Sequence, residues 1–358
     1  MKLIHHHQLV ESEWFTFLLS DVVDEVVYDP DYSYTEGPAI HVVSGNWLPI
    51  RGRTAFFEKC RANSDDLTLL HASDEWYSGG YSEYRHFDRI IRPMRTWLAR
   101  APGIFTIPVG YANGLAGPSE LPPANQRQYL CSFEGAVKAS RIQMVEALRG
   151  VEPSFIHDTR DGSRLSREDY RGLLLDSVFM PCPMGNAAVE TLRLYEALEF
   201  GCIPIVEKRW SIDYYRGLFG ADPFLRVGNW REAAPLMRDL AAAPDELLRL
   251  QQGTVNWWAA TKARTKRELT AFMRGPSHAA DLKRYSQRTR NRVPALHEGL
   301  RLLELLRHQS AGSLAQRLAS PHKILVRVRR NCVADEQPAR KVEDSSGSAE
   351  QGVRSLSS

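Results

Sequence analysis

The sequence lacks a membrane-spanning stretch, because none of its 358 residues fall in a run of 18 or more apolar side chains, the length that a spanning helix needs. No secretory leader is predicted at its start, since Glu11 and Glu13 interrupt the only apolar stretch there. The five cysteines are scattered and odd in number, which excludes a disulfide framework and a zinc-binding spacing. We therefore expect a cytoplasmic protein with reduced thiols.

The chain also has little excess of either positive or negative charge. The chain has 46 Lys and Arg residues against 43 Asp and Glu, a net charge of +3. This mild balance argues against a dedicated nucleic-acid binder, but it leaves room for an anionic ligand such as a nucleotide diphosphate. With 43% hydrophobic and 25% charged residues, the composition is that of a globular protein with substantial cores, and the length favours two domains.

The apolar patterning divides the chain into residues 1–122, residues 123–275 and a basic, then polar and Ser-rich tail at 276–358 that we expect to be disordered from 335 onward. The expected strands are 39–44, 67–71, 104–109, 128–133, 154–157, 177–181 and 203–206. The expected helices are 53–63, 84–100, 137–148, 166–175, 188–200, one beginning near 230, and 244–274. Strands that alternate with helices indicate βαβ units and a parallel sheet.

The most informative segment runs from Phe179 to Val206 and shows the order strand, glycine loop, helix, strand. On the expected helix, Arg193 and Glu196 lie about 60° apart on one face, with Glu190 on the other side of Arg193. A surface helix with ordinary ion pairs would show the same spacing.

A nucleotide diphosphate would suit this segment. The Gly185-Asn186 loop lets the backbone approach a phosphate, and the amides at a helix N-terminus attract it. Arg193 offers a planar charged fork to the phosphate, and the Glu196 carboxylate can accept the two hydroxyls of a ribose. The sequence therefore predicts donor-nucleotide contacts at these residues and at Glu190.

The same residues carry a family resemblance. The Pro-x-Gly185 loop, Glu190-Thr-x-Arg193-x-Tyr195-Glu196-Ala-Leu and Gly201-Cys-Ile-Pro204-Ile-Val resemble the donor-binding half of exostosin-type (family 47) glycosyltransferases. Weaker matches extend the resemblance over roughly residues 67–232: His71-x-Ser-Asp74-Glu75, Ile107-Pro108-x-Gly110-Tyr111, and Ser132-Phe133-x-Gly135 leading to Arg141. Within the family, the sequence is similar to the ribitol xylosyltransferase branch.

The resemblance implies an α/β fold of the GT-B type, with two Rossmann-like domains facing across a cleft. It implies an inverting transferase that moves a sugar from a UDP-sugar to a glycan or another hydroxyl acceptor, as in polysaccharide biosynthesis, with no cofactor and no metal. Two alternatives stay open: a GT-B nucleotide-sugar epimerase, and a catalytically degenerate scaffold that binds a glycan or nucleotide.

Such a reaction needs a base for the acceptor hydroxyl and positive groups for the departing diphosphate. Asp74 and Glu75 are the base candidates because they follow an apolar strand in the N-terminal part. The alternative is that either acid caps a helix or pairs with Arg85 or Arg89.

Lys138 and Arg141 lie in the first helix of the expected donor domain, just after the Gly135 turn. There they are candidates for contacts with the diphosphate, with plain surface charge as the alternative. His157, which follows a strand, is interpreted as a satisfied polar residue, and Cys182 and Cys202 as small core residues.

One competing pattern is Asp29-Pro30-Asp31, which has the form of a metal-binding Asp-x-Asp. Its central proline fits a turn better, and we expect no metal there. The consecutive His5, His6 and His7 are expected to form a flexible end rather than a metal site.

Overall fold

The computed structural model describes residues 1–44, 53–75, 77, 81–138, 140–185, 188–208 and 213–290. All of them belong to one compact unit, Met1–Ser313. Two predictions lie outside the described residues: Asn186 and the disordered stretch at 335–358. Among the described helices, none combines the length and apolar content that crossing a membrane requires.

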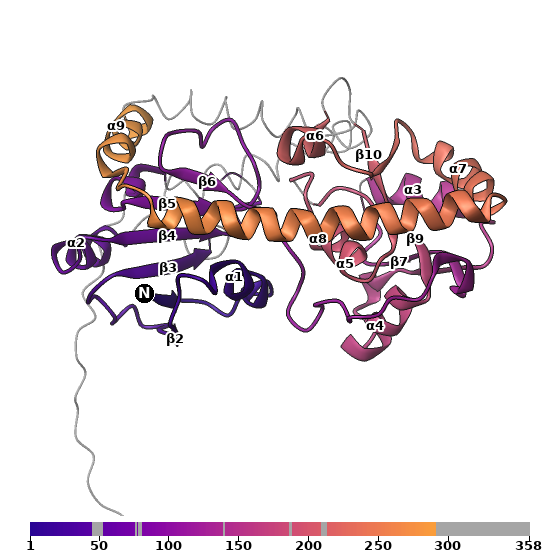
Figure 1. Ribbon diagram of the computed structural model, residues 1–358, viewed down its shortest axis with the longest axis horizontal. Helices are drawn as coiled ribbons and strands as arrows, with labels where there is room; N and C mark the ends of the chain where they lie inside the picture. The colour runs from indigo at the N-terminus through magenta and orange to yellow at the C-terminus, as the bar shows by residue number, and fades with distance from the viewer. Residues whose placement is uncertain are drawn as a thin grey trace, which may run out of the picture. The chain divides into compact units, whose positions relative to one another are not determined.

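A parallel sheet occupies the N-terminal part (Figure 1). Its strands are β1 (Lys2–His5), β2 (Glu25–Tyr28), β3 (Ala39–Ser44), β4 (Leu67–Ala72), β5 (Arg89–Arg92) and β6 (Ile104–Thr106), in the order β2-β1-β3-β4-β5-β6. Helices α1 (Ser12–Leu19) and α2 (Thr54–Ala62) and the 3-10 helix η1 (Tyr81–His86) connect them. The buried apolar residues of β3 and β4 pack with Trp14, Phe15 and Phe57 into one core.

A second parallel sheet holds β7 (Tyr129–Glu134), β8 (Ser154–His157), β9 (Ser177–Cys182), β10 (Ile203–Glu207) and β11 (Leu225–Val227), in the order β11-β10-β9-β7-β8. The helices of this part are α3 (Ser140–Leu148), α4 (Arg167–Leu175), α5 (Leu192–Glu199), α6 (Tyr214–Phe219) and α7 (Ala233–Ala241). The predicted fold class, α/β with two Rossmann-like domains of the GT-B type, is confirmed, because each sheet is parallel and each is connected by helices.

Helix α8 (Pro244–Arg274) contacts both parts of the chain, since it packs on α5 and α7 and also on α1. Figure 1 shows it as one long helix. Its buried residues recur every three or four positions, from Leu247 through Trp258 to Met273, which is the spacing of a helix with one apolar face. The Trp258 ring stacks on that of Trp14 at 5.8 Å.

Helix α9 (Ala279–Arg290) packs against η1. Tyr285 donates its hydroxyl to the Leu98 carbonyl at 2.5 Å, and the Ser286 hydroxyl donates to the Tyr81 carbonyl at 3.1 Å. The segment that was expected to be a basic tail from residue 276 therefore begins with a helix that docks on the first sheet's elements.

Two predicted elements are wrong. The expected helix at 84–100 is replaced by η1 and the strand β5, because Ile90 and Ile91 are fully buried between neighbouring strands of the sheet and Pro93 follows them. The consecutive histidines are not a flexible end. His5 closes β1, and His6 is buried, stacked on Tyr32 with ring centroids 4.0 Å apart.

Several predicted elements match closely. The strands at 39–44 and 154–157 and the helix at 244–274 have the predicted bounds. Cys182, at the end of β9, and Cys202, just before β10, are buried core residues, and burial raises the pKa of both thiols. The strands β1 and β2 and the helix α1 were not predicted.

Candidate functional site

The order of the second sheet contains a switch in direction. From β7 the chain adds β8 on one side, whereas β9, β10 and β11 follow on the other side. In open α/β sheets, ligands bind outside the carboxyl ends of the two strands that flank such a switch. Gly135 directly follows β7 and Gly185 lies three residues past β9, so both predicted glycine turns lie at this edge.

Arg193 lies over the first of these turns. It stands near the start of α5, its Nη2 donates to the Glu134 carbonyl, and its guanidinium carbon is 4.5 Å from the centroid of the Phe133 ring. A Cβ on Gly135 would come within 2.6 Å of Nη2, so a side chain there would displace the guanidinium group. The Nε of Arg193 is buried and has no hydrogen-bond partner in the part of the chain that the structure describes.

Arg141 reaches the same edge from α3. Its Nη1 donates to the Ala136 carbonyl at 3.2 Å and its Nη2 to the Met184 carbonyl at 3.5 Å. Burial lowers the pKa of Arg141 to about 10, with the charge of Arg193 acting in the same direction and Glu75 opposing it. The two arginines therefore lie within electrostatic range of each other.

Two carboxylates act on this pair of cations from nearby, Glu75 on Arg141 and Glu196 on Arg193. The hydrogen bonds that the two guanidinium groups make with described residues go to backbone carbonyls. Two guanidinium groups that repel each other at a partly buried site gain from an anion between them, and their planar forks match phosphate oxygens. The geometry thus favours a phosphate or diphosphate ligand.

The acidic pair Asp74-Glu75 follows β4, and the structure places the two carboxylates in different surroundings. Glu75 is half-buried, and a Cβ on Gly185 would lie 2.8 Å from its Oε1. Glu75 is also within electrostatic reach of Arg141. Its carboxylate therefore lies beside the second glycine turn and within electrostatic reach of Arg141.

Asp74 is enclosed. Its Oδ2 lies 3.1 Å from Arg92 Nη2, and both side chains are 1% exposed. The hydroxyl of Tyr81 also donates to Oδ2, at 3.3 Å. The arginine beside Asp74 is Arg92, rather than the Arg85 or Arg89 that the sequence suggested. Sequence reasoning missed Arg92 because it placed this residue inside a helix.

Glu190 lies outside the helix that was expected to carry it. Helix α5 begins at Leu192, after Thr191 as its N-cap. The Oε1 of Glu190 accepts hydrogen bonds from the backbone N–H of Val109 at 2.8 Å and from the Tyr195 hydroxyl. The Tyr214 hydroxyl donates to its Oε2 at 2.7 Å. Burial raises the pKa of Glu190 against these hydrogen bonds, so this carboxylate ties the loop after β6 to the loop before α5.

Glu196 faces inward from α5. The hydroxyl of Tyr170, in α4, donates to its Oε2 at 2.9 Å, and the backbone of Ala112 also hydrogen-bonds to it. Burial raises the pKa of Glu196, and the nearby Arg193 opposes this. A ribose at Glu196 would have to share the carboxylate with these two partners.

The remaining predictions concern a lysine, a histidine and the early Asp-x-Asp pattern. Lys138 is exposed, and its carbonyl accepts from the backbone N–H of Arg141 at 3.1 Å. His157 is half-buried, with its Nε2 2.9 Å from the Ser163 hydroxyl. Asp29 accepts from the backbone N–H of Ser33 at 2.9 Å within a turn. Among the described residues, no group of three or more His, Cys, Asp or Glu could hold a metal ion.

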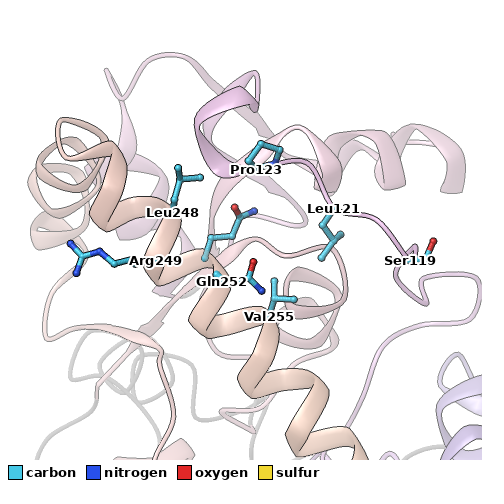
Figure 2. Close-up of a pocket in the computed structure, with 8 residues that line it drawn as sticks. Ser119, Leu121, Pro123, Leu248, Arg249, Gln252 and Val255 are labelled. Atoms are coloured by element: carbon cyan, nitrogen blue, oxygen red, sulfur yellow. The ribbon is translucent and has the colours of Figure 1, made fainter.

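A cavity of about 500 Å³ opens between α8 and the segment that joins β6 to β7 (Figure 2). It is lined by Ser119, Leu121, Pro123, Leu248, Arg249, Gln251, Gln252 and Val255. The Gln251 side chain accepts from the backbone N–H of Ala124 at 2.7 Å and donates to the carbonyls of Pro122 and Gly201, both at 3.1 Å. This amide holds the segment between β6 and β7 against α8. None of the predicted site residues lines the cavity.

Comparison with known proteins gives matches at two levels. Residues 105–232 match the family model described as the Exostosin GT47 domain. Human ribitol-5-phosphate xylosyltransferase 1 is 26% identical over 172 residues, covering 42% of this chain and 38% of that protein. The chain thus spans well under half the length of this curated relative.

Solved structures similar to this chain include an alpha-glucosyltransferase (AGT) in complex with UDP, with 9% identity, coverage of 76% of this chain and 99% of that one, and a TM-score of 0.49. Anabaena Alr3699/HepE in complex with UDP and glucose has 10% identity, coverage of 75% and 98%, and a TM-score of 0.48. The family resemblance carried by the sequence motifs is confirmed by the family model, whose match over residues 105–232 includes both arginines and both glycine turns.

Proposed function

We propose that the protein is an inverting, metal-independent glycosyltransferase that moves a sugar from a UDP-sugar to a hydroxyl of a glycan or another acceptor. The observation that carries this proposal is that Arg141 lies within electrostatic range of both Arg193 and Glu75, beside the turns at Gly135 and Gly185. Two guanidinium groups that hydrogen-bond to backbone carbonyls suit a diphosphate, and the nearby Glu75 carboxylate suits an acceptor hydroxyl.

In the proposed reaction the acceptor oxygen attacks the anomeric carbon while Glu75 accepts the hydroxyl proton. The bond from the anomeric carbon to the diphosphate oxygen breaks, and UDP leaves with the bonding electron pair. Arg141 and Arg193 stabilise the negative charge that grows on the diphosphate, in the role that fixed charges play at other leaving groups. Asp74 is less suited to accept the proton because it is enclosed and paired with Arg92.

The contacts of Lys138, Asn186, Glu190 and Glu196 with the donor are predictions of the sequence. Of these, Glu196 keeps a proposed ribose contact because it lies on the same helix as Arg193. Glu190 is better suited to hold the two loops that it joins. The name of the human relative suggests UDP-xylose as the first donor and a polyol phosphate as the first acceptor to examine.

The test is UDP binding measured by calorimetry. Arg193→Ala is expected to weaken UDP binding by about 1.5–3 kcal/mol, the size of a hydrogen bond to a charged group. Arg149→Ala, an exposed arginine just past the same α3 that carries Arg141, serves as the control and should leave the affinity unchanged. Unaltered UDP binding in Arg193→Ala would remove the basis of the proposal.

Metal independence has its own test. UDP release from UDP-xylose, with and without candidate acceptors, is expected to continue in EDTA, because two guanidinium groups take the place of a divalent cation at the diphosphate. Activity lost in EDTA and restored by manganese would contradict this part of the proposal. Release of UDP that no acceptor accelerates, with isomerised sugar as product, would indicate an epimerase instead.

A further inference from the structure

The side chain of Glu11 is buried and reaches from the start of α1 to the segment after β4. Glu11 is the N-cap residue of α1, and its side chain makes no capping hydrogen bond. Instead its Oε1 accepts the hydroxyl of Ser73 at 2.8 Å, and Glu11 is 4% exposed. The Glu13 amide in that first turn is bound by Asn113 Oδ1 at 2.9 Å. Because burying a carboxylate is costly, the contact with Ser73 calls for an explanation outside α1.

Ser73 opens a strained turn directly after β4. Its φ is +53° and that of Tyr77 is +50°, in the left-handed region that costs a residue with a side chain about 1–2 kcal/mol. The turn is closed by the backbone N–H of Tyr77, which donates to the Asp74 carbonyl at 3.1 Å. Such conformations persist only where the surroundings hold them, and this turn carries Glu75.

A second anchor holds the next residue. Asp74 pairs with Arg92 at the end of β5, the strand beside β4. Arg92 Nη1 also lies 3.4 Å from the Tyr84 hydroxyl. A buried ion pair seldom stabilises a fold over an apolar pair of similar volume, so its value here lies in fixing geometry. The two residues before Glu75 are thus each held by a buried charged side chain.

We propose that Glu11 and Arg92 are positioning residues, which hold the turn that begins at Ser73 so that the Glu75 carboxylate faces Gly185. This inference rests on the proposed function, since it gives Glu75 the task of accepting the proton. A misplacement of about 1 Å at a reacting group can lower a rate about a hundredfold. The turn would otherwise relax out of its left-handed conformations and carry Glu75 away from the glycine turn.

The test compares two replacements of Glu11. Glu11→Gln keeps an oxygen that can accept the Ser73 hydroxyl but cannot take up a proton, whereas Glu11→Leu removes the acceptor. For UDP release from UDP-xylose, Glu11→Gln is expected to keep kcat within about threefold of the parent, and Glu11→Leu to lower kcat at least about tenfold. The KM for UDP-xylose and the Kd for UDP should be unchanged in both. Glu58→Leu, an exposed glutamate on α2, is the matched control and should change none of these.

Two kinetic results would overturn the inference. If Glu11→Gln is as impaired as Glu11→Leu, Glu11 itself handles the proton, which is a role that its raised pKa would also permit. If neither variant changes kcat, the contact with Ser73 has no effect on Glu75.

A measurement that needs no turnover completes the test. Hydrogen exchange at the Tyr77 amide is expected to accelerate at least about tenfold in Glu11→Leu but not in Glu11→Gln, while exchange in β7 stays the same in both. Unchanged exchange at Tyr77 would also overturn the inference. Failure of the proposed function has a different outcome, because the parent protein would then neither bind UDP nor release it from UDP-xylose while the exchange result still reports on the turn.

Discussion

Replacing Arg141 by Met is expected to make the free protein more stable and the donor complex weaker. Burial lowers the pKa of Arg141 to about 10, and this shift corresponds to about 3 kcal/mol against the charged form. Methionine keeps an apolar stem and removes this penalty, but it loses hydrogen bonds at 3.2 and 3.5 Å to two carbonyls, together about 1–2 kcal/mol. The free energy of unfolding should therefore rise by about 1–2 kcal/mol.

The same change should weaken UDP binding about 10- to 150-fold, through the loss of one charged contact. Urea denaturation without ligand and calorimetry with UDP measure the two effects, and Arg149→Met should show neither. Because the folded pKa of Arg141 lies below the unfolded one, the penalty is fully present below about pH 10 and disappears as the pH rises toward the unfolded value. A variant that is less stable than the parent and binds UDP equally well would refute the reasoning.

Three other predictions follow from the contacts of single residues. Glu75→Gln should slow UDP release from UDP-xylose by about 10²–10⁴ with an unchanged UDP Kd. Asp74→Asn should chiefly lower the free energy of unfolding, by about 3–5 kcal/mol, because it leaves Arg92 buried without its counter-charge. If Asp74→Asn instead loses turnover and Glu75→Gln loses stability in urea, Asp74 is the base and Glu75 the structural residue. Glu190→Ala should destabilise the fold by at least about 3 kcal/mol in urea, since it leaves one amide and two tyrosine hydroxyls without their acceptor; equal stability would contradict its role as a tie. Burial lowers the pKa of His6 to about 4, so this histidine takes up a proton at a higher pH in the unfolded chain than in the folded protein. The free energy of unfolding should therefore fall by about 3 kcal/mol as the pH drops from 6.5 toward 4. In urea denaturation, His6→Gln should flatten the dependence of that free energy on pH over this range, and an unchanged slope would contradict the prediction.

The sequence predicts the parts of the fold whose patterns are local. The strand at 39–44 and the helix at 244–274 have uninterrupted apolar periodicity, and both have the predicted bounds. Strand β5 was missed because Arg89 and Arg92 flank only two isoleucines, and the pairing of Arg89 with Asp66 and of Arg92 with Asp74 that buries them depends on distant residues. Strand β1 was missed for a similar reason, since its end is a histidine whose burial depends on neighbouring strands.

In the candidate site too, residues within one continuous motif could be predicted, whereas contacts between distant residues could not. Arg193 and Gly185 could be predicted because the motif that contains them is continuous in the chain. That Arg141 would share an edge with Arg193 depends on β9 pairing with β7, which no short segment encodes. Glu190 was assigned to the wrong environment because the helix begins after Thr191, and a shift of four residues in a helix start changes which side chains share its face.

The docking of α9 on η1 has a consequence for the order in which the chain is made. Ser277 binds Asp88 through its hydroxyl, and the Tyr285 ring stacks on that of Tyr84 at 6.1 Å, so the N-terminal sheet obtains part of its packing from residues nearly 200 positions later. During synthesis the ribosome releases β1 to β6 long before α9, and the aromatic face of η1 must wait uncovered while the entire second sheet is translated. A nascent chain stalled before residue 276 should therefore present that face to chaperones, and one stalled well after residue 290 should not.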